Sequence, residues 1–227
     1  MYIKITMPKY ETTLPMTNKK VTYRPFNVRE EKILLLAQEE NNVESYIRAM
    51  NQIIQECTFD VHSIDTLNKV DAEFLYIQLR NKSLGEGVDV NGICTECDKR
   101  TRITMNLENI KVRNAHVMDA VQLNDTMWVQ LKLPTMKDAL SINDTEGNEA
   151  IARCLDTIII DDNSYNASEY TAEERFEFVE SLTSFQISKF KPFFDTFPAI
   201  EYDFDYKCQH CGADNHVHIE GIENFFV

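Results

Sequence analysis

Two Cys-x-x-Cys pairs at distant positions constrain this chain more than any other feature of its sequence. The first pair is Cys94 and Cys97, in the stretch NGICTECDKR, and the second is Cys208 and Cys211, in KCQHCGADN. With six cysteines in 227 residues, chance gives roughly 0.16 such pairs, so two pairs in one chain indicate a metal site. The thiolates of both pairs together supply the four ligands of a tetrahedral ion.

The sequence around the first pair is repeated around the second. Aligning the second cysteine of each pair places Ile103 on Val217, and the segment LENI that follows lies near IENF in the second copy. Polar and apolar residues alternate on both sides of each pair, which is typical of β-strands. Each copy is therefore predicted to be a strand, a Cys-x-x-Cys turn and a returning strand.

The two halves of this site are separated by 110 residues, from Cys97 to Cys208, so the site is expected to hold the chain's own distant parts together. An all-thiolate set without other cluster motifs favours one structural zinc ion per chain, with iron as the alternative. Four thiolates leave no position for water, which disfavours a catalytic ion. The rival ligand is His210, and His216 and His218 follow on the next strand; all three are expected at the surface.

Periodicity predicts an α+β fold, with an N-terminal β-hairpin and a helical body beside a zinc-ribbon-like β module built from two distant Cys-x-x-Cys hairpins. The hairpin is expected to turn near Asn18, and Cys57 and Cys154 are expected in the core of helical segments. The predicted segments are the hairpin at 1–27, a helical segment at 28–86, the first half of the ribbon at 87–112, an inserted α/β and helical segment at 113–200, and the second half of the ribbon at 201–227.

Within the inserted segment, short helices are predicted at 135–142 and 148–155, and a polar loop is expected after the apolar run at 158–160. Thr171 and Glu174 have the spacing of a capping box for the next helix. Ser188 is predicted to cap the helix after it, whose aromatic stripe we interpret as core. That stripe consists of Phe190, Phe193, Phe194 and Phe197.

A formal net charge of −14 makes nucleic acid and anionic membranes poor default partners. The sequence has no apolar stretch of transmembrane length and no signal-peptide pattern, so an intracellular location is expected. Phosphate-binding glycine motifs and nucleophile motifs are missing, and the acid-rich runs are interpreted as solvated surface, so no enzyme is predicted. A metallohydrolase would need an exchangeable water on the zinc ion. The alternative function is a zinc-ribbon nucleic-acid-binding regulatory protein, for which Lys99, Arg100 and Arg102 are the best support.

Three stretches together resemble the baseplate hub assembly family of T-even-like contractile-tailed bacteriophages. They are VTYRPFNVREEKILLLAQEE at 21–40, IIIDDNSYNASEYTAEERFEFVESL at 158–182, and SKFKPFFDTFPAIEYDFDYKCQHCGADNHVHIEGIENFF at 188–226. The resemblance covers about residues 3–226. It implies a chaperone of hub assembly or a hub component, which contacts other phage tail or baseplate hub proteins in the host cytoplasm and in the tail baseplate. It implies no catalytic residue, and the zinc ligands are assigned from the spacing in this sequence alone.

Overall fold

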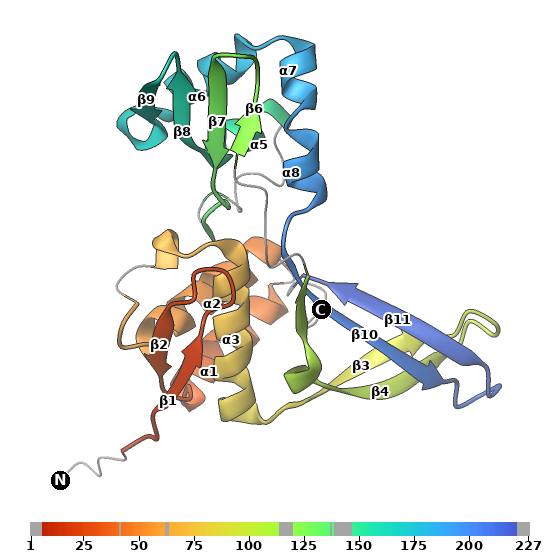
Figure 1. Cartoon of the computed structure of the whole chain (residues 1–227). Helices are drawn as coiled ribbons and strands as arrows, with labels where there is room; N and C mark the ends of the chain where they lie inside the picture. The colour runs from red at the N-terminus through yellow and green to blue at the C-terminus, as the bar shows by residue number, and fades with distance from the viewer. Residues whose placement is uncertain are drawn as a thin grey trace. The chain divides into compact units, whose positions relative to one another are not determined.

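A computed structural model of the chain describes residues 6–40, 42–61, 64–113, 120–136, 138 and 147–221 (Figure 1). The chain divides into two compact units. Unit 1 comprises residues 1–64, 70–113 and 199–227, and unit 2 comprises 65–69 and 114–198. Both units combine helices with antiparallel strands, which confirms the predicted α+β class.

The N-terminal hairpin pairs β1 (Tyr10–Thr13) with β2 (Lys20–Tyr23), as predicted. Asn18 has a φ of 54° in the connecting turn, a left-handed conformation that Asn tolerates better than most residues. The hairpin is tied to the helices because the buried Asp71 carboxylate accepts a hydrogen bond from the Met16 N–H group at 2.8 Å.

The helical part of unit 1 follows the N-terminal hairpin along the chain. It consists of α1 (Val28–Glu39), α2 (Val43–Cys57) and α3 (Lys69–Leu84), with the short 3-10 helices η1 (Ile64–Thr66) and η2 (Leu107–Asn109). Asn27 and Glu30 form a capping box at the start of α1, which satisfies backbone donors of the first turn. Cys57 is fully buried, and this burial raises the pKa of its thiol to about 12. Cys57 is therefore a core residue, as predicted.

The two cysteine pairs each lie in the turn of a long hairpin. The strands are β3 (Gly87–Ile93) with β4 (Arg100–Asn106), and β10 (Ala199–Lys207) with β11 (Asp214–Glu220). The bounds of β4 and β11 are offset by the same 114 positions that separate Cys97 from Cys211. The repeat seen in the sequence is therefore a structural repeat. A third strand, β5 (Lys111–Arg113), pairs with the start of β10 in the register Arg113 to Ala199.

The face of β10 that meets the first hairpin carries a row of aromatic rings. Tyr202, Phe204 and Tyr206 lie in sequence along this face, with centroid distances of 5.5 and 6.2 Å. Gly92 on β3 approaches the end of this row. A Cβ atom at Gly92 would lie 2.7 Å from the Tyr206 ring and 2.6 Å from Ile103 Cδ1. The two hairpins can therefore pack this closely only because position 92 has no side chain.

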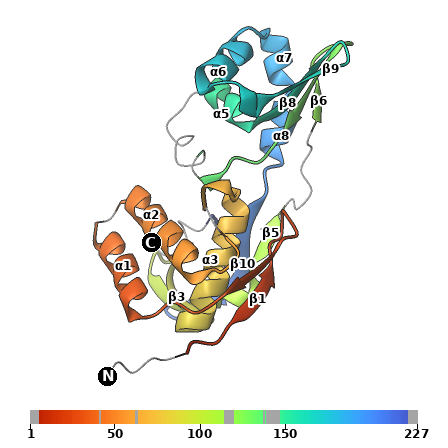
Figure 2. The same ribbon diagram turned by 90° about the vertical axis from the view of Figure 1, so that its left-hand side faces the viewer.

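Unit 2 is built on a four-stranded antiparallel sheet in the order β6-β7-β8-β9. Its strands are β6 (Ala120–Gln122), β7 (Met127–Leu131), β8 (Leu155–Ile160) and β9 (Asn163–Asn166). Its helices are α5 (Gly147–Cys154), the 3-10 helix η3 (Ala167–Glu169), α6 (Ala172–Glu180), α7 (Ser184–Ser188) and α8 (Lys191–Asp195). Figure 2 shows α5 and α6 on the same side of this sheet.

The core of unit 2 lies between the sheet and these helices. Val129 of β7, Val179 of α6 and Cys154 of α5 are fully buried in it. The aromatic stripe is part of the same core, because Phe190 and Phe193 are buried and Phe194 and Phe197 pack against them partly buried. The interpretation of the stripe as core is confirmed.

Two predictions in unit 2 are wrong. Ser188 does not cap a following helix, because it is the last residue of α7 and its hydroxyl donates to the Phe185 carbonyl at 2.7 Å. The helix with the aromatic stripe is α8, whose N-cap position is Phe190 and has no side-chain cap hydrogen bond. The polar stretch after residue 160 is not a loop throughout. Asp161 and Asp162, with φ of 46° and 65°, make a tight turn that returns the chain as β9. The predicted helix at 135–142 lies mostly outside the described residues.

We predict that Gly92→Ala lowers the free energy of unfolding by about 1–3 kcal/mol, the usual cost of overpacking. Urea unfolding followed by circular dichroism measures it. Gly87→Ala on the same strand is the matched control, because the nearest atom to its added Cβ is the Thr104 methyl carbon at 3.4 Å. Equal losses in both variants would contradict the close approach at position 92.

Candidate metal centre

The four cysteines of the two hairpins meet at one point in unit 1. All four sulfur atoms lie within 4.8 Å of one another. The Cys94 and Cys211 sulfurs are 3.6 Å apart, and those of Cys97 and Cys208 are 3.7 Å apart. A tetrahedral ion with metal–sulfur bonds of about 2.3 Å has edges of about 3.8 Å. The sulfur positions therefore fit a four-thiolate ion closely.

The backbone of the two turns has the same conformation. In the first turn, the Cys94 N–H donates to the Lys99 carbonyl and the Asp98 N–H donates to the Cys94 carbonyl. The second turn repeats both hydrogen bonds 114 residues later, at 2.9 Å each. Asp98 has a φ of 56°, and the equivalent residue is Gly212 with 76°. Each turn therefore needs a residue that tolerates the left-handed region directly after its second cysteine.

Backbone N–H groups point at the first sulfur of each pair. The N–H groups of His210 and Cys211 lower the pKa of Cys208 to about 5, and the His210 nitrogen lies 3.4 Å from that sulfur. The Glu96 N–H group is the main cause of a lowered pKa at Cys94. Donors arranged in this way stabilise the thiolate, which is the form that binds metal.

The second cysteine of each pair behaves in the opposite way. The Lys99 N–H group lowers the pKa of Cys97, but desolvation and the neighbouring sulfurs outweigh it and raise the pKa overall. At Cys211, the Ala213 N–H group also lowers the pKa. The neighbouring sulfurs, that of Cys97 first among them, outweigh this effect together with desolvation and raise the pKa of Cys211 to about 12. Each close sulfur contact therefore joins a cysteine with a lowered pKa to one with a raised pKa. A bound cation would allow all four sulfurs to ionise.

Thr101 and Asn215 complete the surroundings of the sulfurs and were not identified from the sequence. They occupy equivalent positions in the repeat and are both buried. Asn215 Nδ2 donates to Cys94 Sγ at 3.6 Å, and Thr101 Oγ1 donates to Cys208 Sγ at 3.7 Å. Each side chain therefore binds the first cysteine of the opposite hairpin.

The same two side chains also accept hydrogen bonds from the opposite turn. The Thr95 N–H donates to Asn215 Oδ1 at 2.9 Å, and the Gln209 N–H donates to Thr101 Oγ1 at 3.4 Å. The sequence carries a signal for these two residues. At matching positions of both copies, a polar residue stands where the alternation along the strand leads one to expect an apolar residue. Each hairpin thus holds the sulfur-bearing turn of its partner in place.

The histidines near the site are exposed, as predicted. His210 Nε2 lies 3.1 Å from the Arg100 carbonyl oxygen. On the outer face of β10 and β11, His218 Nδ1 lies 2.8 Å from Asp203, which raises the pKa of His218 and lowers that of Asp203. Glu201 lies close enough to this pair to share a cation. However, Arg113 already lies 3.9 Å from Glu201, so we interpret this face as a ladder of cross-strand ion pairs.

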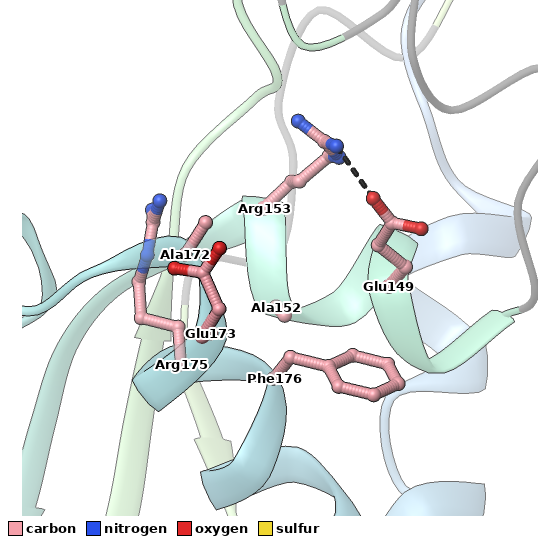
Figure 3. A pocket seen from close by; sticks show the side chains of 7 residues that line it. All are labelled: Glu149, Ala152, Arg153, Ala172, Glu173, Arg175 and Phe176. Atoms are coloured by element: carbon pink, nitrogen blue, oxygen red, sulfur yellow. Dashed lines mark hydrogen bonds and ion pairs between the residues drawn. The ribbon is translucent and has the colours of Figure 1, made fainter.

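A pocket of about 230 Å³ lies between α5 and α6 in unit 2 (Figure 3). On one side of it, Arg153 forms an ion pair with Glu149. Its described lining is Glu149, Ala152, Arg153, Ala172, Glu173, Arg175 and Phe176. This lining provides carboxylates and guanidinium groups around the side chain of Phe176.

Several residues of the acid-rich runs have structural roles in the fold. Glu174 forms the predicted capping box with Thr171, Asp161 and Asp162 make the turn before β9, and Asp203 pairs with His218.

None of the helices in the described ranges has the length and apolarity that a membrane crossing requires.

We predict that Asn215→Leu and Thr101→Val each weaken the binding of added Zn²⁺ about 10- to 100-fold, the usual effect of losing a partner of a metal ligand. Competition with a coloured chelator measures the affinity. Thr104→Val is the control on β4, because its hydroxyl binds exposed Asp89 and not a sulfur. Unchanged affinity in both of the first two variants would rule out their role.

Comparison with known proteins identifies the family. A sequence model described as T4 bacteriophage base plate protein matches residues 7–227. No curated protein and no solved structure matches the chain. The matched region extends through both units and contains all four cysteines. The chain therefore belongs to the T4 bacteriophage base plate protein family.

Proposed function

We propose that this chain is a non-enzymatic protein of the phage baseplate hub, which acts through contacts with other tail proteins either as an assembly chaperone or as a structural component. The observation that carries the proposal is the match to a base plate family over residues 7–227, which includes both units. Contacts with other phage proteins would form in the host cytoplasm during tail assembly and persist where the protein remains in the baseplate.

We further propose that Cys94, Cys97, Cys208 and Cys211 hold one structural zinc ion per chain. The sulfur distances of 3.6 and 3.7 Å and the N–H groups directed at Cys94 and Cys208 support this assignment. The ion would supply positive charge and four strong bonds. Since four thiolates complete the tetrahedron, no position remains for a substrate or an activated water. The ion would therefore fix the shape of unit 1 and take no part in a reaction.

The alternative of a nucleic-acid-binding zinc ribbon has less support. Arg102, one of the three basic residues beside the first turn, forms an ion pair with Asp89. Lys99 and Arg100 are exposed beside it, but the chain as a whole has a net charge of −14. So few cations release few counterions from a phosphate backbone. A gel shift of duplex DNA at physiological salt would favour this alternative.

We predict that the purified full chain contains one zinc ion and that Cys94→Ser and Cys208→Ser remove it with similar losses of thermal stability. The losses should be similar because both residues complete one tetrahedron, and structural zinc in peptides contributes roughly 10–16 kcal/mol of apparent binding energy. Elemental analysis and thermal denaturation measure these effects.

Cys154→Ala is the control for the cysteine variants, because Cys154 is buried in unit 2 and lies outside the cluster. It should leave the metal content at one ion per chain. Substitution with cobalt gives a further check. An intense tetrahedral thiolate spectrum that anions do not change is expected, whereas a spectrum that shifts with added anions would indicate an open, hydrolase-like site.

The proposed partners can be sought directly in infected cells. We predict that tagged protein isolated during tail assembly brings down other phage tail proteins, identified by mass spectrometry. Tagged Cys208→Ser protein should retain fewer of them, since its hairpins are no longer held together. If the native chain retrieved no phage tail protein at any stage of infection, the hub function would be contradicted.

A further inference from the structure

Unit 2 has an apolar groove that its own core does not fill. The groove has a volume of about 450 Å³ and lies between α6 and the β8–β9 end of the sheet. It is lined by Ile158, Ile160, Tyr165, Tyr170 and Phe178, with Glu174, Arg175 and Glu177 at its charged side. Tyr165 is 41% exposed and Tyr170 is 39% exposed. Two aromatic side chains thus remain accessible to a partner, and tyrosine is among the residues enriched at binding hot spots.

The surface around the groove is strongly acidic. Residues 161–180 contain seven carboxylate side chains and one guanidinium group, and every one of those acids is exposed. Four of them, Glu173, Glu174, Glu177 and Glu180, lie on α6 itself. This concentration of negative charge attracts a cationic segment and repels an anionic one.

Strand β9 gives the groove a second means of recognition. Among the strands that the structure describes, it is the last of its sheet, with β8 as its neighbour on one side. Its sequence, NSYN, has no lysine or proline, the residues that commonly protect a sheet edge. Along a strand, alternate side chains point to the same face. An added strand could therefore pair with β9 and direct every second side chain toward the groove.

We propose that this groove binds an extended, basic segment of a partner protein, which pairs with the edge of β9 and places apolar side chains in the groove. This inference rests on the proposed function, because it specifies the chemistry of the partner. Binding of this kind combines main-chain hydrogen bonds with pockets for alternate side chains. The flanking cations of the segment would interact with Glu174 and Glu177.

The charge of the surface argues against two other occupants. A second copy of the chain would bring a further net charge of −14 to an already acidic surface. Nucleic acid is excluded from such a surface by its phosphates. Arg175 reduces the charge locally, but its Nε atom already donates to the Thr171 carbonyl at 3.4 Å. A basic protein segment is the occupant that the charges favour.

The test uses the purified full chain and the synthetic peptide acetyl-KKFTVKK-amide, in which the apolar residues alternate and lysines stand at both ends. We expect amide chemical-shift changes by NMR confined to β8, β9 and α6. The control peptides EEFTVEE, with reversed charge, and KKSTSKK, without apolar anchors, should bind at least about tenfold more weakly. Equal binding of either control, or changes centred on unit 1, would overturn the proposal.

Variants of exposed residues locate the binding on the protein. Tyr165→Ser and Glu177→Lys should each weaken binding of the KKFTVKK peptide about tenfold. The matched controls are Phe185→Ser, which removes an aromatic ring that is 72% exposed on α7, and Glu39→Lys in unit 1. Both controls should bind as the native chain does. If the Tyr165→Ser substitution prevents β9 from forming, the Tyr170→Ser variant is measured in its place. A doubled mass of the native chain in solution that Tyr165→Ser abolishes would show that a second copy occupies the groove.

The same variants separate this inference from the proposed function in infected cells. If the native chain retrieves tail proteins and the Tyr165→Ser and Glu177→Lys chains retrieve them equally well, the groove is not the contact and the hub function stands. If the peptide binds as described but the native chain retrieves no tail protein, the groove is supported and the hub function fails.

Discussion

The meeting of four sulfur atoms from two hairpins is the interaction on which the structure of unit 1 depends. Closing a loop of more than one hundred residues costs on the order of 4 kcal/mol in chain entropy, which the contacts between the two hairpins must offset. The hairpins are held by aromatic packing against Gly92 and by the cross-bonded Thr101 and Asn215. A shared ion would add the largest single contribution. Because Arg113 and Ala199 are register partners, the chain enters and leaves residues 114–198 at neighbouring positions of the same sheet.

Features determined by short-range patterns could be predicted from the sequence. The cysteine spacing, the alternation in the flanking strands and the match of Ile103 to Val217 together predicted the repeat, and the periodicity predicted a helical segment where α1, α2 and α3 lie. These patterns are local, so they can be recognised without knowledge of tertiary contacts. The aromatic stripe around Phe193 was also predicted as core, and it is buried.

Features that depend on distant partners were missed. Thr101 and Asn215 are polar residues whose role is visible only when the opposite hairpin is in place. Strand β9 has a polar sequence and pairs because the Asp161–Asp162 turn returns it to β8. Ser188 is a residue type that often caps helices, but its hydroxyl donates to the Phe185 carbonyl within α7, and α8 begins only after Phe190. In each case a tertiary contact or a neighbouring residue decided between two locally acceptable structures. The segment boundaries at 113 and 200 stay predictions.

X-ray absorption spectroscopy of the purified full chain at the zinc edge identifies the atoms bound to the ion and their distances. A closed four-thiolate site gives four sulfur neighbours at about 2.3 Å in one shell, and no lighter ligand. A shell containing nitrogen or oxygen would contradict it, because the ion would then be bound by a histidine, a carboxylate or water and the two hairpins would not share a closed four-thiolate site.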